Sequence, residues 1–380
     1  MKRAVIVGAG IGGLATALRL GRDGWDTVVV ERAPARRSSG YLVNIIGPGY
    51  DAAERLGLLP ALAAHGLGVF TTVLVRADGR PKFTVPSAVA DAVLGERALT
   101  VFRGDLESAL HEAVRERTDF RFGTTVTSID GVRVELSDGT TEHADLLVGA
   151  DGVHSATRTA VFGPDFRVDL PYVVGAFPLP QPVPGVPESS ATTFIGKGRM
   201  AAVVNLGPRR SAAFFTYRCA DPAAELARGP AGALGAAFGD LVGGVPEALQ
   251  HLATDPDAAY FDAVSKVVMP RWSSGRTVLL GDAAWCVTLF AGHGAALALA
   301  GADRLGAALQ EHDDIPAALS AWEAALRPEA RKRQALARRG MLQYAPPSEL
   351  HVLLNDLTIR AITLPGIRTL IRRSIQRASR

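Results

Sequence analysis

Three glycines near the N-terminus have a spacing that is typical of phosphate binding. Gly8, Gly10 and Gly13 form a GxGxxG pattern between a β-branched run, RAVIV, and a stretch with helical spacing, LATALRL. In such a pattern the first glycine allows a tight turn, the second lets a pyrophosphate approach the backbone, and the third allows the helix to pack closely. The N–H groups at the start of the helix then favour a phosphate. The pattern predicts a dinucleotide site.

An acidic residue follows these glycines at a distance that suits a ribose contact. Glu31 ends the next predicted strand, DTVVVE, 18 residues after Gly13. Its carboxylate can accept hydrogen bonds from an adenosine ribose. The first 20 residues also have the charged start and apolar run of a secretory signal. The order strand, turn, helix and strand instead favours nucleotide binding.

A long uncharged stretch lies in the last third of the chain. The 20 residues between Asp282 and Asp303 include no Asp, Glu, Lys or Arg, and this length would suit a membrane span. Gly292, His293 and Gly294 interrupt it, at a point where we expect a loop to give way to a helix. The small residues that follow allow this helix to pack closely on a sheet. We therefore predict a buried helix whose start faces a ligand, and no integral membrane span.

The segment 124–158 predicts short antiparallel strands, then a buried strand and a helix. IDG and SDG have the chemistry of hairpin turns. DLLVGADG contains the apolar run of a buried strand, and Ser155 is suited to cap the helix that follows.

Three motifs now stand in a fixed order along the chain: GAGIGG at 8–13, GADGVHSATR at 149–158 and LLGDAA at 279–284. Arg103, in VFRGDLESAL, lies between the first two. In this order and spacing the sequence resembles the group A flavoprotein monooxygenases, which include para-hydroxybenzoate hydroxylase and the tetracycline-modifying monooxygenases. The resemblance covers residues 1 to about 310 and implies FAD as the cofactor.

The resemblance implies an α/β fold in which a Rossmann-like FAD-binding domain of the GR2 type is interleaved with an antiparallel β-sheet substrate domain and followed by a C-terminal helix. The expected FAD-binding domain comprises 1–70, 98–165 and 265–340, the substrate-binding domain comprises 71–97 and 166–264, and 341–380 form a C-terminal helical segment.

The resemblance also implies roles for individual residues. Gly8, Gly10, Gly13 and Glu31 would bind the ADP half of FAD, with Val126 at the adenine edge. Arg103 would face the pyrophosphate or ribityl region, and Asp282 would accept a ribityl hydroxyl. The expected cofactor-binding set is Gly8, Gly10, Ile11, Gly12, Gly13, Glu31, Arg32, Arg103, Val126, Asp151, Gly152, Asp282, Gly292, Gly294 and Ala295. For each acid alone, a helix cap or turn is the alternative.

In this family NAD(P)H reduces FAD, and reaction with O2 gives a C4a-hydroperoxyflavin that hydroxylates the substrate. We therefore expect an FAD-dependent monooxygenase that acts on a cyclic, aromatic or polyketide-like small molecule. The flavin carries the chemistry, so no side chain is assigned as catalytic; His293 and Phe290 are the candidates. Strand alternation and chain position suggest substrate contacts, for which core packing is the alternative, at Tyr41, Asn44, Val203, Asn205, Phe215, Tyr217 and Phe290.

The third motif is followed by residues that depart from the usual family pattern. These are Trp285, Thr288, Leu289, His293 and Ala296. Gly292 and Gly294 are retained, so backbone donors at the start of the next helix can still stabilise negative charge on the flavin pyrimidine ring. An FAD enzyme of natural-product tailoring that catalyses a non-hydroxylating step, such as a cyclisation or another oxidation, stays open as the alternative.

Composition excludes several other classes. A net charge of +3 gives no basic patch that would predict nucleic-acid binding. The two cysteines form no CxxC pair, which fits a reducing compartment, and we therefore expect a cytoplasmic protein. We expect it to be a monomer or a homodimer. HEAV at 111–114 lacks the second histidine of a zinc motif, so no metal is expected. None of the four tryptophans lies in a WxW pair, so the sequence lacks the signature of a halogenase. The Ala, Gly and Arg bias indicates a high-GC source, with which natural-product tailoring, such as antibiotic biosynthesis or modification, is associated.

The segment 341–380 has apolar residues at helical spacing, arginines toward its end and Pro365 as an interruption. We expect a terminal helix that packs across the two domains with its basic end in solvent. A basic amphipathic helix on a membrane surface is the alternative.

Overall fold

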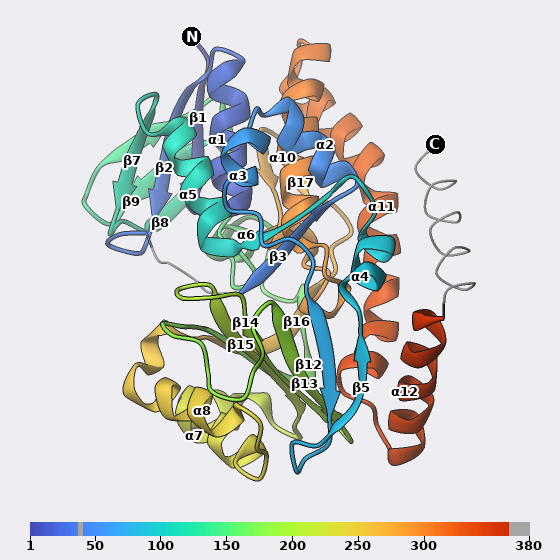
Figure 1. Ribbon diagram of the computed structural model, residues 1–380. Helices are drawn as coiled ribbons and strands as arrows, with labels where there is room; N and C mark the ends of the chain where they lie inside the picture. The colour runs from blue at the N-terminus through green and yellow to red at the C-terminus, as the bar shows by residue number, and fades with distance from the viewer. Residues whose placement is uncertain (37–40, 365–380) are drawn as a thin grey trace.

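The computed structural model describes residues 1–36 and 41–364. A six-stranded sheet lies in the upper part of Figure 1, with most of its labelled strands toward the left. Its strands are parallel except for β17, and their order is β17-β18-β11-β1-β2-β7. The inner strands are runs of buried apolar residues, as expected where both faces of a parallel sheet are covered. The strands are β1 (Arg3–Val7), β2 (Asp26–Glu31), β7 (Thr118–Phe122), β11 (Leu146–Gly149), β17 (Ser273–Ser274) and β18 (Thr277–Leu279).

Helices cover one face of this sheet and a small sheet covers the other. On the helical face, α1 packs between α5 and α10. On the other face, Val5, Val28 and Leu147 pack against Val134 and Leu136 of the small sheet. The elements are α1 (Ile11–Arg22), α5 (Arg103–Val114), α6 (Ala156–Phe162) and α10 (Gly294–Glu311), with strands β8 (Val126–Asp130), β9 (Arg133–Leu136) and β10 (Thr141–His143). The expected Rossmann-like FAD-binding fold is confirmed.

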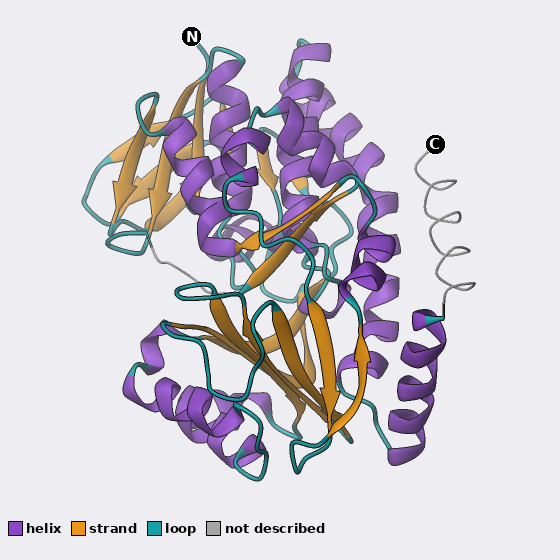
Figure 2. Ribbon diagram, viewed as in Figure 1, coloured by secondary structure: helices purple, strands orange, loops and turns teal. Residues whose placement is uncertain are grey.

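A seven-stranded sheet forms the lower layer, in the order β16-β12-β15-β14-β13-β4-β5 (Figure 2). Strands from 71–85 join it through the pairing of β4 with β13. Two helices cover one face, where Phe177 and Phe215 pack against Leu234 and Phe238. The elements are β4 (Thr71–Val75), β5 (Pro81–Val85), β12 (Arg167–Leu179), β13 (Ser190–Gly196), β14 (Arg199–Asn205), β15 (Ser211–Arg218), α7 (Pro222–Phe238), α8 (Val245–Thr254), η1 (Pro256–Ala258) and β16 (Tyr260–Val267).

Short elements connect the two sheets. A two-stranded sheet pairs β3 with β6 and leads directly into α5. Two single-turn elements, α9 and η2, follow β18 and precede α10. The elements are β3 (Leu42–Ile46), α2 (Pro48–Arg55), α3 (Leu59–Ala63), α4 (Ser87–Leu94), β6 (Ala98–Phe102), α9 (Asp282–Trp285) and η2 (Leu289–Ala291).

Two helices, α11 (Ile315–Tyr344) and α12 (Glu349–Thr363), end the described chain. Helix α11 packs along α10, touches η2, and continues past residue 340 without a break (Figure 1). Helix α12 packs on β5 and β13, where Lys82 Nζ lies 3.1 Å from Asp356 Oδ2. Its outer face exposes leucines 350, 353, 354 and 357. The basic end of the segment lies outside the described residues. None of the helices within the described ranges has the length and apolar character that a membrane crossing needs.

A close approach between α2 and α10 gives a test of the packing. A Cβ atom added at Gly49 would lie 2.4 Å from Ala296 Cα, and backbone cannot move aside as a side-chain end can. We expect Gly49→Ala to lower the free energy of unfolding by about 1–3 kcal/mol, measured by urea denaturation. Gly235→Ala in α7 is the control, because an added Cβ there meets nothing within 4 Å. Equal stability of the two variants would contradict this account.

Candidate active site

The glycine turn has the geometry that a dinucleotide needs. Gly8 has φ +106°, and an added Cβ there would lie 2.5 Å from the carbonyl oxygen of Ala150. A Cβ at Gly13 would lie 1.9 Å from Gly8 O, so α1 packs directly on the turn. Gly10 is the N-cap of α1 and provides no side-chain cap. The first N–H groups of α1 therefore have no capping side chain and remain able to bind an anion.

Glu31 lies at the end of β2, beside this turn. Its Oε2 accepts a hydrogen bond from Ala9 N–H at 2.8 Å, and its Oε1 accepts one from Ala33 N–H, also at 2.8 Å. These bonds fix the carboxylate next to the start of α1, and each oxygen retains lone pairs for a ribose hydroxyl. Thr124 N–H donates to Glu31 O, which brings Val126 to the same edge of the sheet. Arg32 is exposed there.

Arg103 connects the glycine turn with β3. Its backbone N–H donates to Tyr41 O at 2.9 Å, extending the β3–β6 pairing, and its guanidinium carbon lies 5.4 Å from the Tyr41 ring centre. Its Nη2 lies 2.9 Å from Glu107 Oε1 and faces the position where Gly10 would carry a Cβ. Desolvation opposes its charge, but interactions with Tyr41 and Glu107 raise the pKa of Arg103 above its ordinary value. Arg103 is therefore a fixed positive charge at the turn.

The second motif packs against the first. The turn at Ala150–Asp151 touches Gly8, and Gly152 has φ +79°. Asp151 accepts hydrogen bonds from Ser155 Oγ at 2.5 Å and from Thr157 N–H at 2.9 Å, so its carboxylate caps the start of α6. Arg158 from the same motif is buried, and its Nη1 donates to Ala283 O at 3.1 Å. Arg158 thus ties the second motif to the third.

Asp282 and the start of α10 complete this group. Asp282 is exposed to solvent, and desolvation by the surrounding protein raises the pKa of its carboxyl. Its Oδ1 lies 3.9 Å from where Gly294 would carry a Cβ. The N-cap of α10, His293, makes no side-chain cap bond, so the first N–H groups of this helix also lack a capping side chain.

The loop before α10 holds the residues that depart from the family pattern. Trp285 is buried in the core, with its ring centre 4.7 Å from that of Trp272. Thr288 has φ +71°, and within the described part of the chain its buried hydroxyl has no hydrogen-bond partner. Ala296 faces Gly49 rather than open space. A larger side chain at 296 would collide with α2, which explains the small residue there.

An aromatic cluster joins this loop to the seven-stranded sheet. The Phe290 ring centre lies 5.4 Å from that of Tyr172 and 5.6 Å from that of Tyr344. Phe214, on β15, lies 6.3 Å from Tyr344. At the other side, the ring of Tyr260 lies 5.4 Å from that of Tyr41. Desolvation raises the pKa of Tyr41, Tyr260 and Tyr344, so these phenols remain neutral.

Five other candidates are not brought to this cluster. Asn44 Oδ1 accepts a hydrogen bond from Thr100 Oγ1 at 2.8 Å within the two-stranded sheet. Val203, Phe215 and Tyr217 are buried on the face of the seven-stranded sheet opposite Phe214, where they pack with α7 and α8. Asn205 is buried at the end of β14. We do not propose them as substrate contacts.

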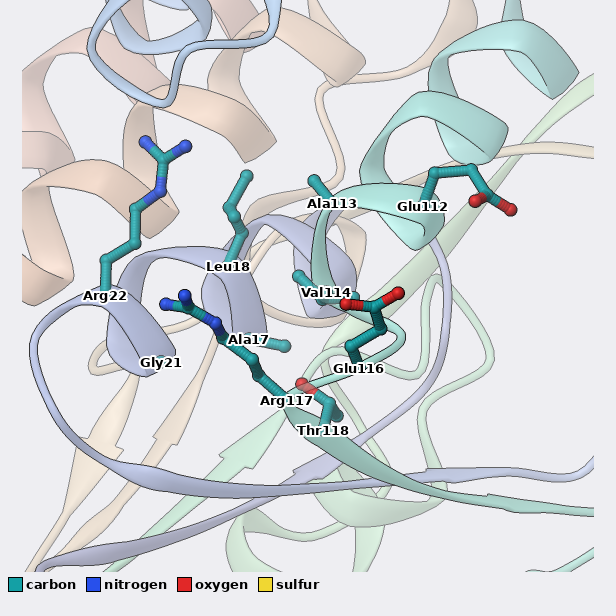
Figure 3. A pocket seen from close by; sticks show the side chains of 10 residues that line it. All are labelled: Ala17, Leu18, Gly21, Arg22, Glu112, Ala113, Val114, Glu116, Arg117 and Thr118. Atoms are coloured by element: carbon teal, nitrogen blue, oxygen red, sulfur yellow. The ribbon is translucent and has the colours of Figure 1, made fainter.

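A surface pocket of about 330 Å³ lies at the far end of α1 (Figure 3). Four residues of α1 and six residues around the end of α5 line it, including Arg22, Glu112 and Arg117. The glycine turn is at the opposite end of α1. This pocket is therefore separate from the motif residues.

A model of the FAD binding domain family matches residues 2–314. This chain therefore belongs to the family of FAD-dependent monooxygenases. The FAD-dependent monooxygenase asL4 of Sarocladium schorii is 28% identical to this chain, in an alignment that covers 95% of this chain and 92% of asL4. The 2-heptyl-3-hydroxy-4(1H)-quinolone synthase of Mycobacteroides abscessus is 31% identical, in an alignment that covers 91% of this chain and 92% of the synthase. The structure of Klebsiella pneumoniae HpxO with FAD and uric acid aligns with a TM-score of 0.76 and 25% sequence identity. The alignment covers 97% of this chain and 96% of HpxO.

The flavoenzyme has side chains and turns that fit FAD. Arg103 supplies positive charge beside the uncapped start of α1, which suits a pyrophosphate. Glu31 lies at the end of β2 for a ribose, and Asp282 lies beside the start of α10. We propose that Ile11, Gly12 and Ala295, which lie at the two helix starts, contact the cofactor through their backbone.

The sequence alone did not lead us to several residues of this candidate site in the flavoenzyme. Arg158 ends the motif GADGVHSATR, so its position was available from the sequence. Phe214 is the neighbour of Phe215 and lies on the opposite face of β15. Tyr260 and Tyr344 come from β16 and the end of α11, and no local pattern distinguishes them.

Proposed function

We propose that this flavoenzyme uses NAD(P)H and O2 to hydroxylate a neutral, cyclic small molecule. The observation that carries the proposal is the aromatic cluster between the loop that precedes α10 and one face of the seven-stranded sheet. Bound FAD would supply the redox chemistry, by accepting hydride from NAD(P)H and forming with O2 the C4a-hydroperoxide that transfers oxygen. The protein's part is to orient the substrate and exclude water.

The cluster favours an aromatic or polyketide-like ring. Phe290, Tyr344 and Phe214 offer ring faces and edges, which bind flat apolar molecules by offset or edge contacts. The phenol groups of Tyr260 and Tyr344 stay neutral and can donate hydrogen bonds to a carbonyl or hydroxyl of the substrate. The charges of Arg103 and Asp282 lie near Tyr41 and Tyr260, on the cofactor-binding side of the cluster.

The test is a screen of NADH and NADPH consumption with cyclic candidates such as quinolones and polyketide phenols, followed by mass analysis of the products. We expect a substrate that accelerates consumption and gains one oxygen atom. Phe214→Ala should raise KM about tenfold, because about 1.4 kcal/mol of ring contact is lost, while the affinity for FAD is unchanged. Flavin reduction with a product that gains no oxygen would instead support the non-hydroxylating alternative.

A further inference from the structure

Both ring nitrogens of His293 are committed in hydrogen bonds. Nε2 lies 2.7 Å from Nη1 of Arg333, and a guanidinium can only donate. Nε2 is therefore the acceptor, and the ring proton is on Nδ1, where it donates to Ala291 O. Desolvation, with the charge of Arg333, lowers the pKa of His293, in agreement with a neutral imidazole. This imidazole has no free nitrogen with which to exchange a proton with substrate.

Arg333 is itself held on α11. Its Nε donates to Glu329 Oε1 at 2.7 Å, and Nη2 lies 2.6 Å from the same oxygen, one helical turn away. The Arg333 and Glu329 side chains are only 20% and 24% exposed. Because the pair is largely shielded from water, the guanidinium is held in one direction more firmly than a surface arginine would be.

A second contact from α11 supports the same loop. A Cβ added at Gly340 would lie 2.3 Å from Phe290 O, so the helix backbone packs directly on η2. Gly340 follows Arg333 by seven residues, which is about two helical turns and thus the same face. Helix α11 therefore fixes the loop on both sides of Gly292, just before the uncapped start of α10.

We propose that Arg333 is a positioning residue that acts through His293 to aim the start of α10 at the flavin pyrimidine ring. This rests on the proposed placement of FAD beside Asp282 and α10. Negative charge grows on that ring when FAD is reduced, and aligned N–H groups stabilise it most when they are held in advance. Arg333 thereby favours reduced over oxidised FAD without contacting a substrate.

The test is the two-electron midpoint potential of the FAD-loaded protein, measured by dye equilibration without substrate, NAD(P)H or O2. We expect Arg333→Ala to weaken binding of reduced FAD about tenfold more than that of oxidised FAD, which lowers the potential by about 30 mV. Arg333→Ala added to His293→Ala should cause no further shift, because the two residues act in series. The control is Arg331→Ala, whose side chain is exposed on α11 and whose potential should match the wild type.

Two results would overturn the proposal: an unchanged potential in Arg333→Ala, or a full additional shift in the His293→Ala background, which would mean that Arg333 acts by its own charge. If Arg333→Ala fails to fold, Glu329→Gln keeps the guanidinium and removes its anchor, and we expect about a threefold effect of the same sign; no shift there counts against the proposal. A failure of the proposed hydroxylation would appear only in the substrate screen and leave these potentials unaffected.

Discussion

Replacing Gly13 by alanine should severely weaken FAD binding. The added Cβ would lie 1.9 Å from the backbone oxygen of Gly8, and neither atom can rotate aside, so α1 must move away from the turn. This movement separates the N–H groups of α1 from the pyrophosphate that they are expected to bind. We expect the dissociation constant for FAD, measured by quenching of flavin fluorescence, to rise more than about 100-fold, or about 2.7 kcal/mol.

The control for Gly13→Ala is available in the same helix. A Cβ at Gly21 meets nothing within 4 Å, and alanine is the better helix former. Gly21→Ala should keep wild-type affinity for FAD and gain about 0.5–1 kcal/mol of stability. Wild-type affinity in Gly13→Ala would mean that the close contact between turn and helix has no part in cofactor binding.

Loss of the Arg103 side chain should have the second largest effect. The guanidinium is placed between the glycine turn and Tyr41, where it would form charge-assisted hydrogen bonds with cofactor oxygens. Such bonds contribute about 1.5–3 kcal/mol each, so we expect Arg103→Ala to weaken FAD binding about 10- to 100-fold. Isothermal titration of the apoprotein with FAD measures this directly.

The controls separate this effect from damage to the fold. Arg103→Ala leaves the carboxyl of Glu107, which is buried, without its partner. The double variant Arg103→Ala/Glu107→Gln removes that unpaired charge and should regain stability but not FAD affinity. Arg115→Ala, at the exposed far end of α5, should bind FAD as the wild type does. If the double variant recovers the affinity, Arg103 serves only to neutralise Glu107.

The FAD-binding fold could be predicted from the sequence because its signals are local. A glycine that needs φ +106°, and a second glycine that touches the first, leave a pattern within six residues. The acid at Glu31 follows from the strand that ends there. Each of these depends on backbone geometry within one strand, turn or helix.

The substrate side could not be predicted in the same way, because alternation shows which residues share a face but not what covers it. Phe215 and Tyr217 do share a face, and that face is covered by α7 and α8. Phe214 lies on the other face and meets Tyr344, 130 residues further along the chain. Trp285 likewise directly follows a recognised motif but packs against Trp272 and Trp322. Contacts of this kind depend on how distant elements are layered.

Helix α11 sets a fixed register between the cofactor loop and the aromatic cluster. Arg333 and Tyr344 are eleven residues apart, which is about three turns, so both face the site at points about 16 Å apart. One residue inserted between them would rotate Tyr344 by about 100° relative to Arg333 and turn it away from Phe214. The number of residues in this span, as much as their identity, therefore fixes the distance between the aromatic cluster and the start of α10.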